Sequence, residues 1–132
     1  MLQDYRFTAL VTLAGLAAFF ATGLFVGAGR HRFNIVAPAT TGHPEFERRF
    51  RVQMNTLEWL VIFVPALWLF ALAWSNDRLA AAVGAVWVLG RLIYMVTYYR
   101  EATSRGPGFL IQLAAAAILW FGAVAGVVRT FL

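Results

Sequence analysis

Long hydrophobic stretches, separated by short polar segments, follow one another along the chain. About 20 apolar residues in a helix cross a hydrocarbon core of about 30 Å. The pattern predicts four such helices, over residues 7–29, 44–75, 79–99 and 106–128. We therefore expect an all-α integral membrane protein, a four-transmembrane-helix bundle that forms a single domain over residues 1–132.

The second predicted helix is longer than a bilayer is thick. Pro44 suits the first turn of a helix, and Glu45 and Glu47 complement the positive end of its dipole. From Pro44 to Ser75 such a helix would measure roughly 48 Å. Its first turns therefore lie outside the hydrocarbon or line a polar cleft, and Pro65 predicts a kink in the apolar half.

The connections between the predicted helices are short. They cover residues 30–41, 76–78 and 100–108. The first six residues lack the basic start and the small-residue cleavage site of a signal peptide, so we expect the first helix to be retained. Glycines spaced four apart predict close packing of the first and fourth helices against neighbours. The two pairs are Gly23 with Gly27 and Gly122 with Gly126.

The distribution of charge predicts how the chain is oriented in the membrane. All eleven basic residues are arginines, in a chain that is 61% hydrophobic and only 13% charged. Seven lie around the first and third connections: Arg30, Arg32, Arg48, Arg49, Arg51, Arg100 and Arg105. The opposite end carries Arg6, Arg78 and Arg129. The positive-inside rule places the first group in the cytosol and both termini on the other side, in the inner membrane if the source is bacterial.

The absence of cysteine excludes several kinds of chemistry. Without it the chain forms no disulfide, no thiolate metal site and no protein thiol nucleophile. His31 and His43 are the two histidines, too few for a metal cluster, so no metal is expected. The net charge of +5 is explained by how the arginines are distributed between the two sides of the membrane, and it does not indicate nucleic-acid binding. Any thiol chemistry would need a ligand that supplies the sulfur.

A polar stripe lies where the second helix enters the apolar region. At about 100° per residue, Arg51, Asn55 and Glu58 fall within roughly 60° of one another on a helix. Unsatisfied polar groups in hydrocarbon cost several kcal/mol, so these side chains need partners. Pairing between helices is one explanation. A small ligand that carries both signs of charge is the other.

The third helix predicts a second polar stripe at the same depth. Arg91, Tyr94 and Tyr98 share one face, and Arg105 joins them if the helix continues that far. An ion pair between Arg91 and Glu58, with the tyrosines as interface anchors, would explain part of this pattern. Three arginines beside one carboxylate would still leave positive charge unmatched, and a ligand with carboxylates would match it.

These residues resemble the MAPEG superfamily, the small membrane proteins that include microsomal glutathione transferases and leukotriene C synthases. The matching residues are Arg30, the segment from Thr40 to Arg48, the motif Arg51…Asn55…Glu58 and the set Arg91…Tyr94…Tyr98…Arg105. The hydropathy pattern agrees along the whole chain, while the specific motifs cover roughly residues 30–59 and 90–105.

The resemblance implies a homotrimer with three glutathione sites between neighbouring subunits. The positions of Arg51, Asn55 and Glu58 hold the charged ends of glutathione. Tyr94 and Tyr98 would add contacts from a helix of the adjacent subunit, with Gln53 and Arg30 as helpers. The position of Arg105 stabilises the thiolate in such enzymes, and Arg30 is the second choice for that role.

Elementary electrostatics supports a thiolate role for an arginine. A free thiol titrates near 8.5, and only the thiolate is a nucleophile. Lowering that pKa by about two units requires roughly 2.7 kcal/mol of preferential stabilisation of the anion. An arginine in a partly desolvated cleft can supply this. Hydrophobic electrophiles would then reach the sulfur from the bilayer.

The resemblance therefore predicts a membrane-embedded glutathione transferase acting on hydrophobic electrophiles, with a glutathione-dependent peroxidase activity that reduces lipid hydroperoxides as a candidate side activity. A non-catalytic lipid-binding protein is the alternative, although such family members lack the arginine at position 105. A small multidrug exporter usually needs an acidic residue in its first span, and residues 7–29 contain none. Trp59 follows the motif glutamate where eicosanoid-forming relatives have a tyrosine, and His31 follows Arg30 where leukotriene C synthases have a second arginine. Both departures argue against a strict leukotriene-type substrate.

Overall fold

The computed structural model describes residues 2–132, which form four long helices joined by short connections. The elements are η1 (Leu2–Tyr5), α1 (Arg6–Phe33), α2 (Pro44–Trp74), α3 (Asp77–Arg100), η2 (Ala102–Arg105) and α4 (Gly106–Arg129). Each of the four long helices is long and apolar enough to cross a membrane. No strand occurs in the described part of the chain. The predicted all-α membrane bundle is confirmed.

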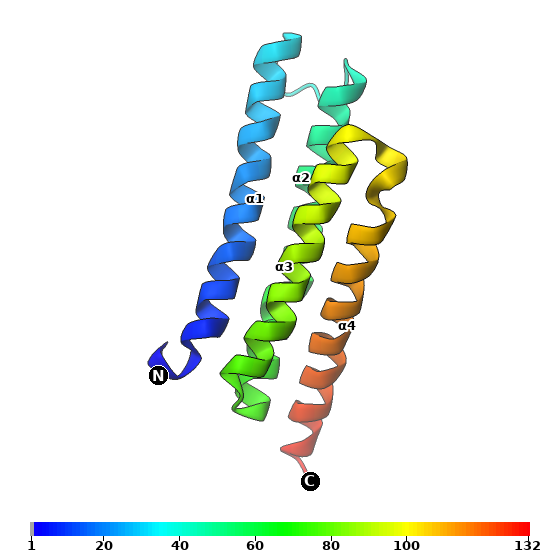
Figure 1. Cartoon of the computed structure of the whole chain (residues 1–132). Coiled ribbons are helices and arrows are strands. Elements are labelled where there is room, and N and C mark those ends of the chain that lie inside the picture. Colours follow the sequence, from blue (N-terminus) through cyan, green and yellow to red (C-terminus); the bar gives the residue numbers. More distant parts are fainter. Residues whose placement is uncertain (1) are drawn as a thin grey trace.

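The four long helices run side by side as a bundle (Figure 1). α2 and α3 form its centre, α1 packs against both from one side, and α4 packs against both from the other. The two termini lie at one end of the bundle, and the connections rich in arginine lie at the opposite end (Figure 1). The structure thus separates the two arginine groups by the length of the helices, and the side that faces the cytosol stays a prediction.

The first helix is longer than predicted. It continues through Arg30, His31 and Arg32, which were expected in a loop, and ends where Asn34 adopts a left-handed conformation with φ 53°. Basic side chains in the last turn favour this extension because they interact with the negative end of the helix dipole. The extra turn lies alongside the first turns of α2, so both helices extend beyond the apolar region together.

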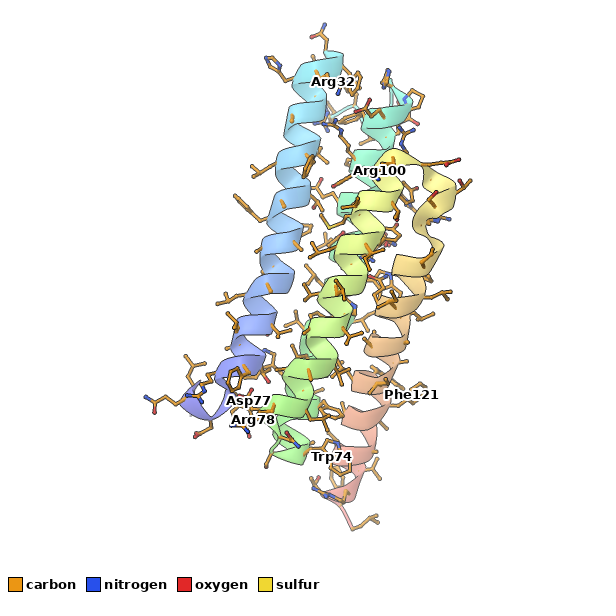
Figure 2. The ribbon with its side chains drawn as sticks, viewed as in Figure 1. Arg32, Trp74, Asp77, Arg78, Arg100 and Phe121 are labelled. Carbon is orange, nitrogen blue, oxygen red and sulfur yellow. The ribbon has the colours of Figure 1, made fainter. Side chains whose placement is uncertain are left out.

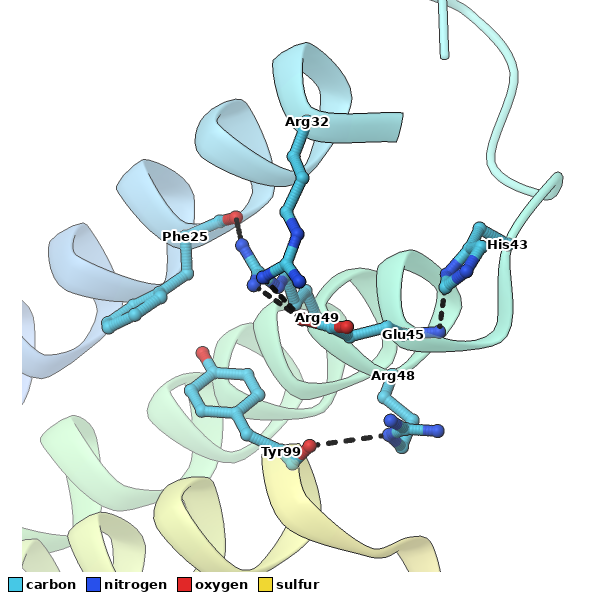
Figure 3. Close-up of polar contacts among 7 residues, drawn as sticks. All are labelled: Phe25, Arg32, His43, Glu45, Arg48, Arg49 and Tyr99. Atoms are coloured by element: carbon cyan, nitrogen blue, oxygen red, sulfur yellow. Dashed lines mark hydrogen bonds and ion pairs between the residues drawn. The ribbon is translucent and has the colours of Figure 1, made fainter. Parts of the chain in front are cut away.

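Hydrogen bonds join neighbouring helices at both ends of the bundle. Asp77, at the start of α3, accepts hydrogen bonds from the backbone N–H groups of Phe7 and Thr8 at 3.1 and 2.7 Å, and so caps α1. Trp74, Asp77 and Arg78 mark this end in Figure 2, with Arg32 and Arg100 at the other. At that other end, Arg49 donates to the carbonyl of Phe25 in α1 at 3.2 Å (Figure 3).

The interior is built from aromatic stacking and close backbone approach. Phe63 and Trp87 stack face to face with their ring centroids 3.9 Å apart, and both are fully buried. Gly90 and Gly108 bring α3 and α4 together, because a Cβ on Gly90 would lie 2.7 Å from the backbone nitrogen of Gln112. Large apolar side chains such as Phe121 point outward instead (Figure 2), as a lipid-facing surface requires.

The predicted glycine contacts are confirmed for one pair and not for the other. A Cβ on Gly122 would collide with the Phe70 ring, and one on Gly126 would lie 2.6 Å from Ala73. A Cβ on Gly27 would meet nothing within 4 Å among residues 2–132. Pro65 lies within α2, which runs through it without interruption, and the kink stays a prediction.

Candidate functional site

A pocket with two arginines in its wall opens where α2, α3 and the start of α4 meet. Its volume is about 260 Å³, and we call it the arginine pocket. It is lined by Arg51, Asn55, Tyr94, Arg105, Gly106 and Phe109. Four of these six were predicted from the polar stripes of the second and third helices. The structure therefore brings the two stripes together within a single chain, whereas the resemblance implied that Tyr94 and Tyr98 come from an adjacent subunit.

Arg105 reaches the pocket by a route that differs from the prediction. α3 ends at Arg100, because Glu101 is extended with φ −152° and ψ 129°, and the expected continuation of that helix to Arg105 is wrong. The chain then turns through η2 and folds back beside α3. The Arg105 guanidinium donates to the Tyr98 hydroxyl at 3.4 Å, and its carbon lies 5.3 Å from the centre of that ring.

The arginine pocket carries positive charge that no carboxylate in residues 2–132 neutralises. Neither Arg51 nor Arg105 takes part in an ion pair within this part of the chain. The nearby Arg49 and Arg32 differ, because both bind Glu45, at 2.8 and 3.4 Å (Figure 3). The pocket therefore offers two guanidinium groups to an anionic ligand, while the neighbouring cluster is largely satisfied.

A buried arginine lies behind the pocket. Arg91 has 0% of its surface exposed. Its two terminal nitrogens donate to the Asn55 carbonyl oxygen at 3.0 and 3.1 Å, and its Nε donates to the Gln112 carbonyl oxygen at 2.6 Å. The ion pair between Arg91 and Glu58, which was the alternative to a ligand, does not form. Asn55 lies between them instead, because its amide nitrogen donates to Glu58 at 3.3 Å.

Arg51 connects the arginine pocket to a second groove, because it lines both. Tyr94 and Tyr98 are 2% and 7% exposed, with ring centroids 5.4 Å apart. Tyr98 and Arg51 also line a groove of about 480 Å³ that extends toward Thr41 and Arg48 at the start of α2. A ligand longer than the arginine pocket therefore finds further polar surface without leaving the chain.

Two predicted site residues lie elsewhere in this chain. Gln53 is about 200° around the helix from Arg51, and its amide nitrogen would be 3.4 Å from a Cβ on Gly23 of α1. Arg30 donates to the carbonyl of Ala39 at 2.7 Å, and its guanidinium carbon lies 5.0 Å from the Phe46 ring. Arg30 belongs to α1 and Gln53 faces α1, so both lie on the α1 side of the bundle.

The structure adds residues that the sequence analysis missed. The Thr56 hydroxyl accepts a fourth hydrogen bond from Arg91 at 3.2 Å, and Gln112 binds the opposite edge of that guanidinium. Gln112 is the single amide side chain in the uncharged stretch over residues 106–128. An isolated polar residue in a membrane span generally has a polar partner, so the sequence could have identified it. No feature of the sequence pointed to Phe109, which lines the pocket and packs edge to face against Trp59 with the ring centroids 5.7 Å apart.

Comparison with known proteins gives consistent matches over nearly the whole chain. The profile of the MAPEG family matches residues 8–125. Human microsomal glutathione S-transferase 2 is 38% identical over 109 residues, which cover 83% of this chain and 74% of that protein. Bovine leukotriene C4 synthase is 35% identical over 130 residues, covering 90% and 85%. The uncharacterized protein sll1147 of Synechocystis is 42% identical over 116 residues, covering 88% and 84%.

Proposed function

The chain belongs to the MAPEG family, and we propose that it is a membrane-embedded glutathione transferase that adds the glutathione thiolate to hydrophobic electrophiles. The observation that carries the proposal is the pair of uncompensated guanidinium groups, Arg51 and Arg105, in one pocket. The similarity to microsomal glutathione S-transferase 2 and leukotriene C4 synthase supports glutathione as the co-substrate.

The charges of glutathione complement those of the proposed site. Its two carboxylates suit arginine, which binds carboxylates through two parallel N–H groups, and its ammonium suits Glu58. We assign one carboxylate to Arg51 and further polar contacts to Asn55, Tyr94 and Tyr98. In the proposed homotrimer, the α1 side of a neighbouring subunit would contribute its own Arg30 and Gln53 to this site.

The proposed reaction requires only that the sulfur be deprotonated and aimed at lipid. The thiol releases its proton to solvent water, Arg105 stabilises the resulting thiolate, and the thiolate attacks an electrophilic carbon of the acceptor. A carbon–sulfur bond forms, and the electron pair leaves with the departing group or stays on the oxygen of an opened epoxide, which then takes up a proton. Phe109 and Trp59 provide an apolar wall beside the pocket from which an acceptor dissolved in the membrane could approach.

Titration of the purified protein with glutathione in detergent tests the proposal. We expect thiolate ultraviolet absorbance at neutral pH, and either conjugation of at least one aryl halide or epoxide or reduction of a lipid hydroperoxide to its alcohol, with two glutathione molecules oxidised to the disulfide. S-methylglutathione is the control, because it keeps all the charges but cannot form a thiolate. Glutathione binding without thiolate absorbance or turnover would favour the non-catalytic lipid-binding alternative. Absence of glutathione binding would overturn the proposal.

We also propose that the arginine-rich end of the bundle faces the cytosol. The seven arginines at that end outnumber the three at the other, as the positive-inside rule requires. Cytosolic placement would also bring the arginine pocket to the compartment in which thiols are kept reduced.

A further inference from the structure

Arg91 occupies a position where burying a charged side chain costs free energy. It lies within the apolar stretch of α3, is fully buried, and contacts no carboxylate among residues 2–132. A buried arginine in a membrane span costs several kcal/mol unless its donors are satisfied, and such residues generally serve function. An apolar side chain of similar length could fill the same space, so packing alone does not account for an arginine here.

The hydrogen bonds of Arg91 fix the orientation of the Asn55 amide. A guanidinium has donors and no acceptor, so the Asn55 atom that faces both terminal nitrogens, at 3.0 and 3.1 Å, must be the carbonyl oxygen. The Asn55 amide nitrogen must then point the other way. It donates to the Glu58 Oε2 atom at 3.3 Å.

This orientation has a consequence for Glu58, the carboxylate assigned to the glutathione ammonium. Glu58 is exposed, and its hydrogen bond from Asn55 is the one that holds it within residues 2–132. A reversed Asn55 amide would turn an oxygen toward the carboxylate and repel it. The two terminal nitrogens of Arg91 form a two-pronged fork that donates to the Asn55 oxygen. This fork prevents the reversal, because a reversed amide would turn its NH₂ group toward two donors.

We propose that Arg91 is a positioning residue that acts through Asn55 to hold the Glu58 carboxylate ready for the ammonium group of the thiol substrate. The inference rests on the proposed function, because it assigns a recognition role within the same site. Arg91 does not line the arginine pocket, whereas Asn55 does. Arg91 therefore affects which thiol substrate is preferred, and not the reactivity of the sulfur.

The test compares glutathione with its deamino analogue, which keeps the thiol and both carboxylates but lacks the ammonium group. The measured quantity is the ratio of kcat/KM for the two thiols. A loss of correctly folded protein lowers both values equally and cancels from this ratio, so a purely structural defect does not change it. We expect the unmodified protein to prefer glutathione by about tenfold or more, and Glu58→Gln to reduce the ratio to about one.

Arg91→Met should lower the preference to less than a third of its original value, because the Asn55 amide becomes free to reverse. Arg91→Lys keeps a charge for the buried acceptors if the methionine variant fails to fold. It should give an intermediate ratio, since an ammonium cannot reproduce the fork. Gln112→Met is the matched control: it removes another Arg91 partner but leaves both bonds to Asn55, so its ratio should be unchanged.

The outcomes separate this inference from the proposed function. If both Arg91 variants retain the full ratio while Glu58→Gln loses it, Arg91 has no positioning role, and glutathione use stands. If the unmodified protein conjugates both thiols equally well, the ammonium is not recognised and the inference fails alone. If the protein neither binds nor uses either thiol, both proposals are refuted.

Discussion

Replacement of Arg105 by alanine should raise the pKa of the bound glutathione thiol. The guanidinium is exposed, but one side of it lies against the nearly buried Tyr98. For a sulfur about 4 Å away and an effective dielectric constant of about 40, the attraction is about 2 kcal/mol. That corresponds to about 1.5 pKa units, which places the bound thiol near 7 in place of about 8.5.

The expected change in rate depends on pH. At pH 7 the thiolate fraction should fall from about one half to about 3%, roughly sixteenfold, if the pKa rises by 1.5 units. A more basic thiolate is also a better nucleophile, by about fivefold for that shift at a Brønsted slope of about 0.45. The net loss in kcat is therefore about threefold at pH 7 and about sixfold at pH 6. The loss disappears near pH 8, and above about pH 9, where both proteins hold mostly thiolate, the variant should be about four- to fivefold faster than the unmodified protein.

The assay is thiolate absorbance as a function of pH at saturating glutathione, alongside kcat over the same range. Arg105→Lys should keep most of the shift because it keeps a positive charge. Arg100→Ala is the matched control, since Arg100 is exposed at the end of α3 but does not line the arginine pocket. An Arg105→Ala protein whose thiol titrates as in the unmodified protein would refute the assigned role, whatever happens to turnover.

Two further predictions concern binding and packing. Arg51→Ala should raise KM for glutathione about ten- to a hundredfold, the equivalent of one charge-assisted hydrogen bond. It should leave thermal stability unchanged, because Arg51 makes no ion pair within residues 2–132, and a lower melting temperature in detergent would contradict that reading. Gly108→Ala should destabilise the bundle by about 1–3 kcal/mol or more, because the added methyl collides with the backbone of Tyr94. Gly27→Ala, whose methyl meets nothing within 4 Å, should unfold at the same or a higher temperature.

The predictions from periodicity agree with the structure for two pairs of residues, each within one helix. Arg51 and Asn55 share a face of α2 because three or four residues complete a turn, and the structure places both in one pocket. Tyr94 and Tyr98 face the same way on α3 for the same reason. Arg105 also lies beside Tyr98, but the helical periodicity that predicted this does not apply, because Glu101 leaves the helix.

The long apolar stretches and the polar residues that interrupt them determined by themselves that this is a four-helix membrane protein with charge gathered at one end. Hydrocarbon accepts only helices whose backbone groups are satisfied internally, so composition and length suffice for that conclusion. Only the tertiary structure decided which partner each buried polar group has. The Arg91 donors go to Asn55 and Gln112 in place of Glu58, because that choice depends on how three separate helices are aligned along their axes, which no single helix encodes.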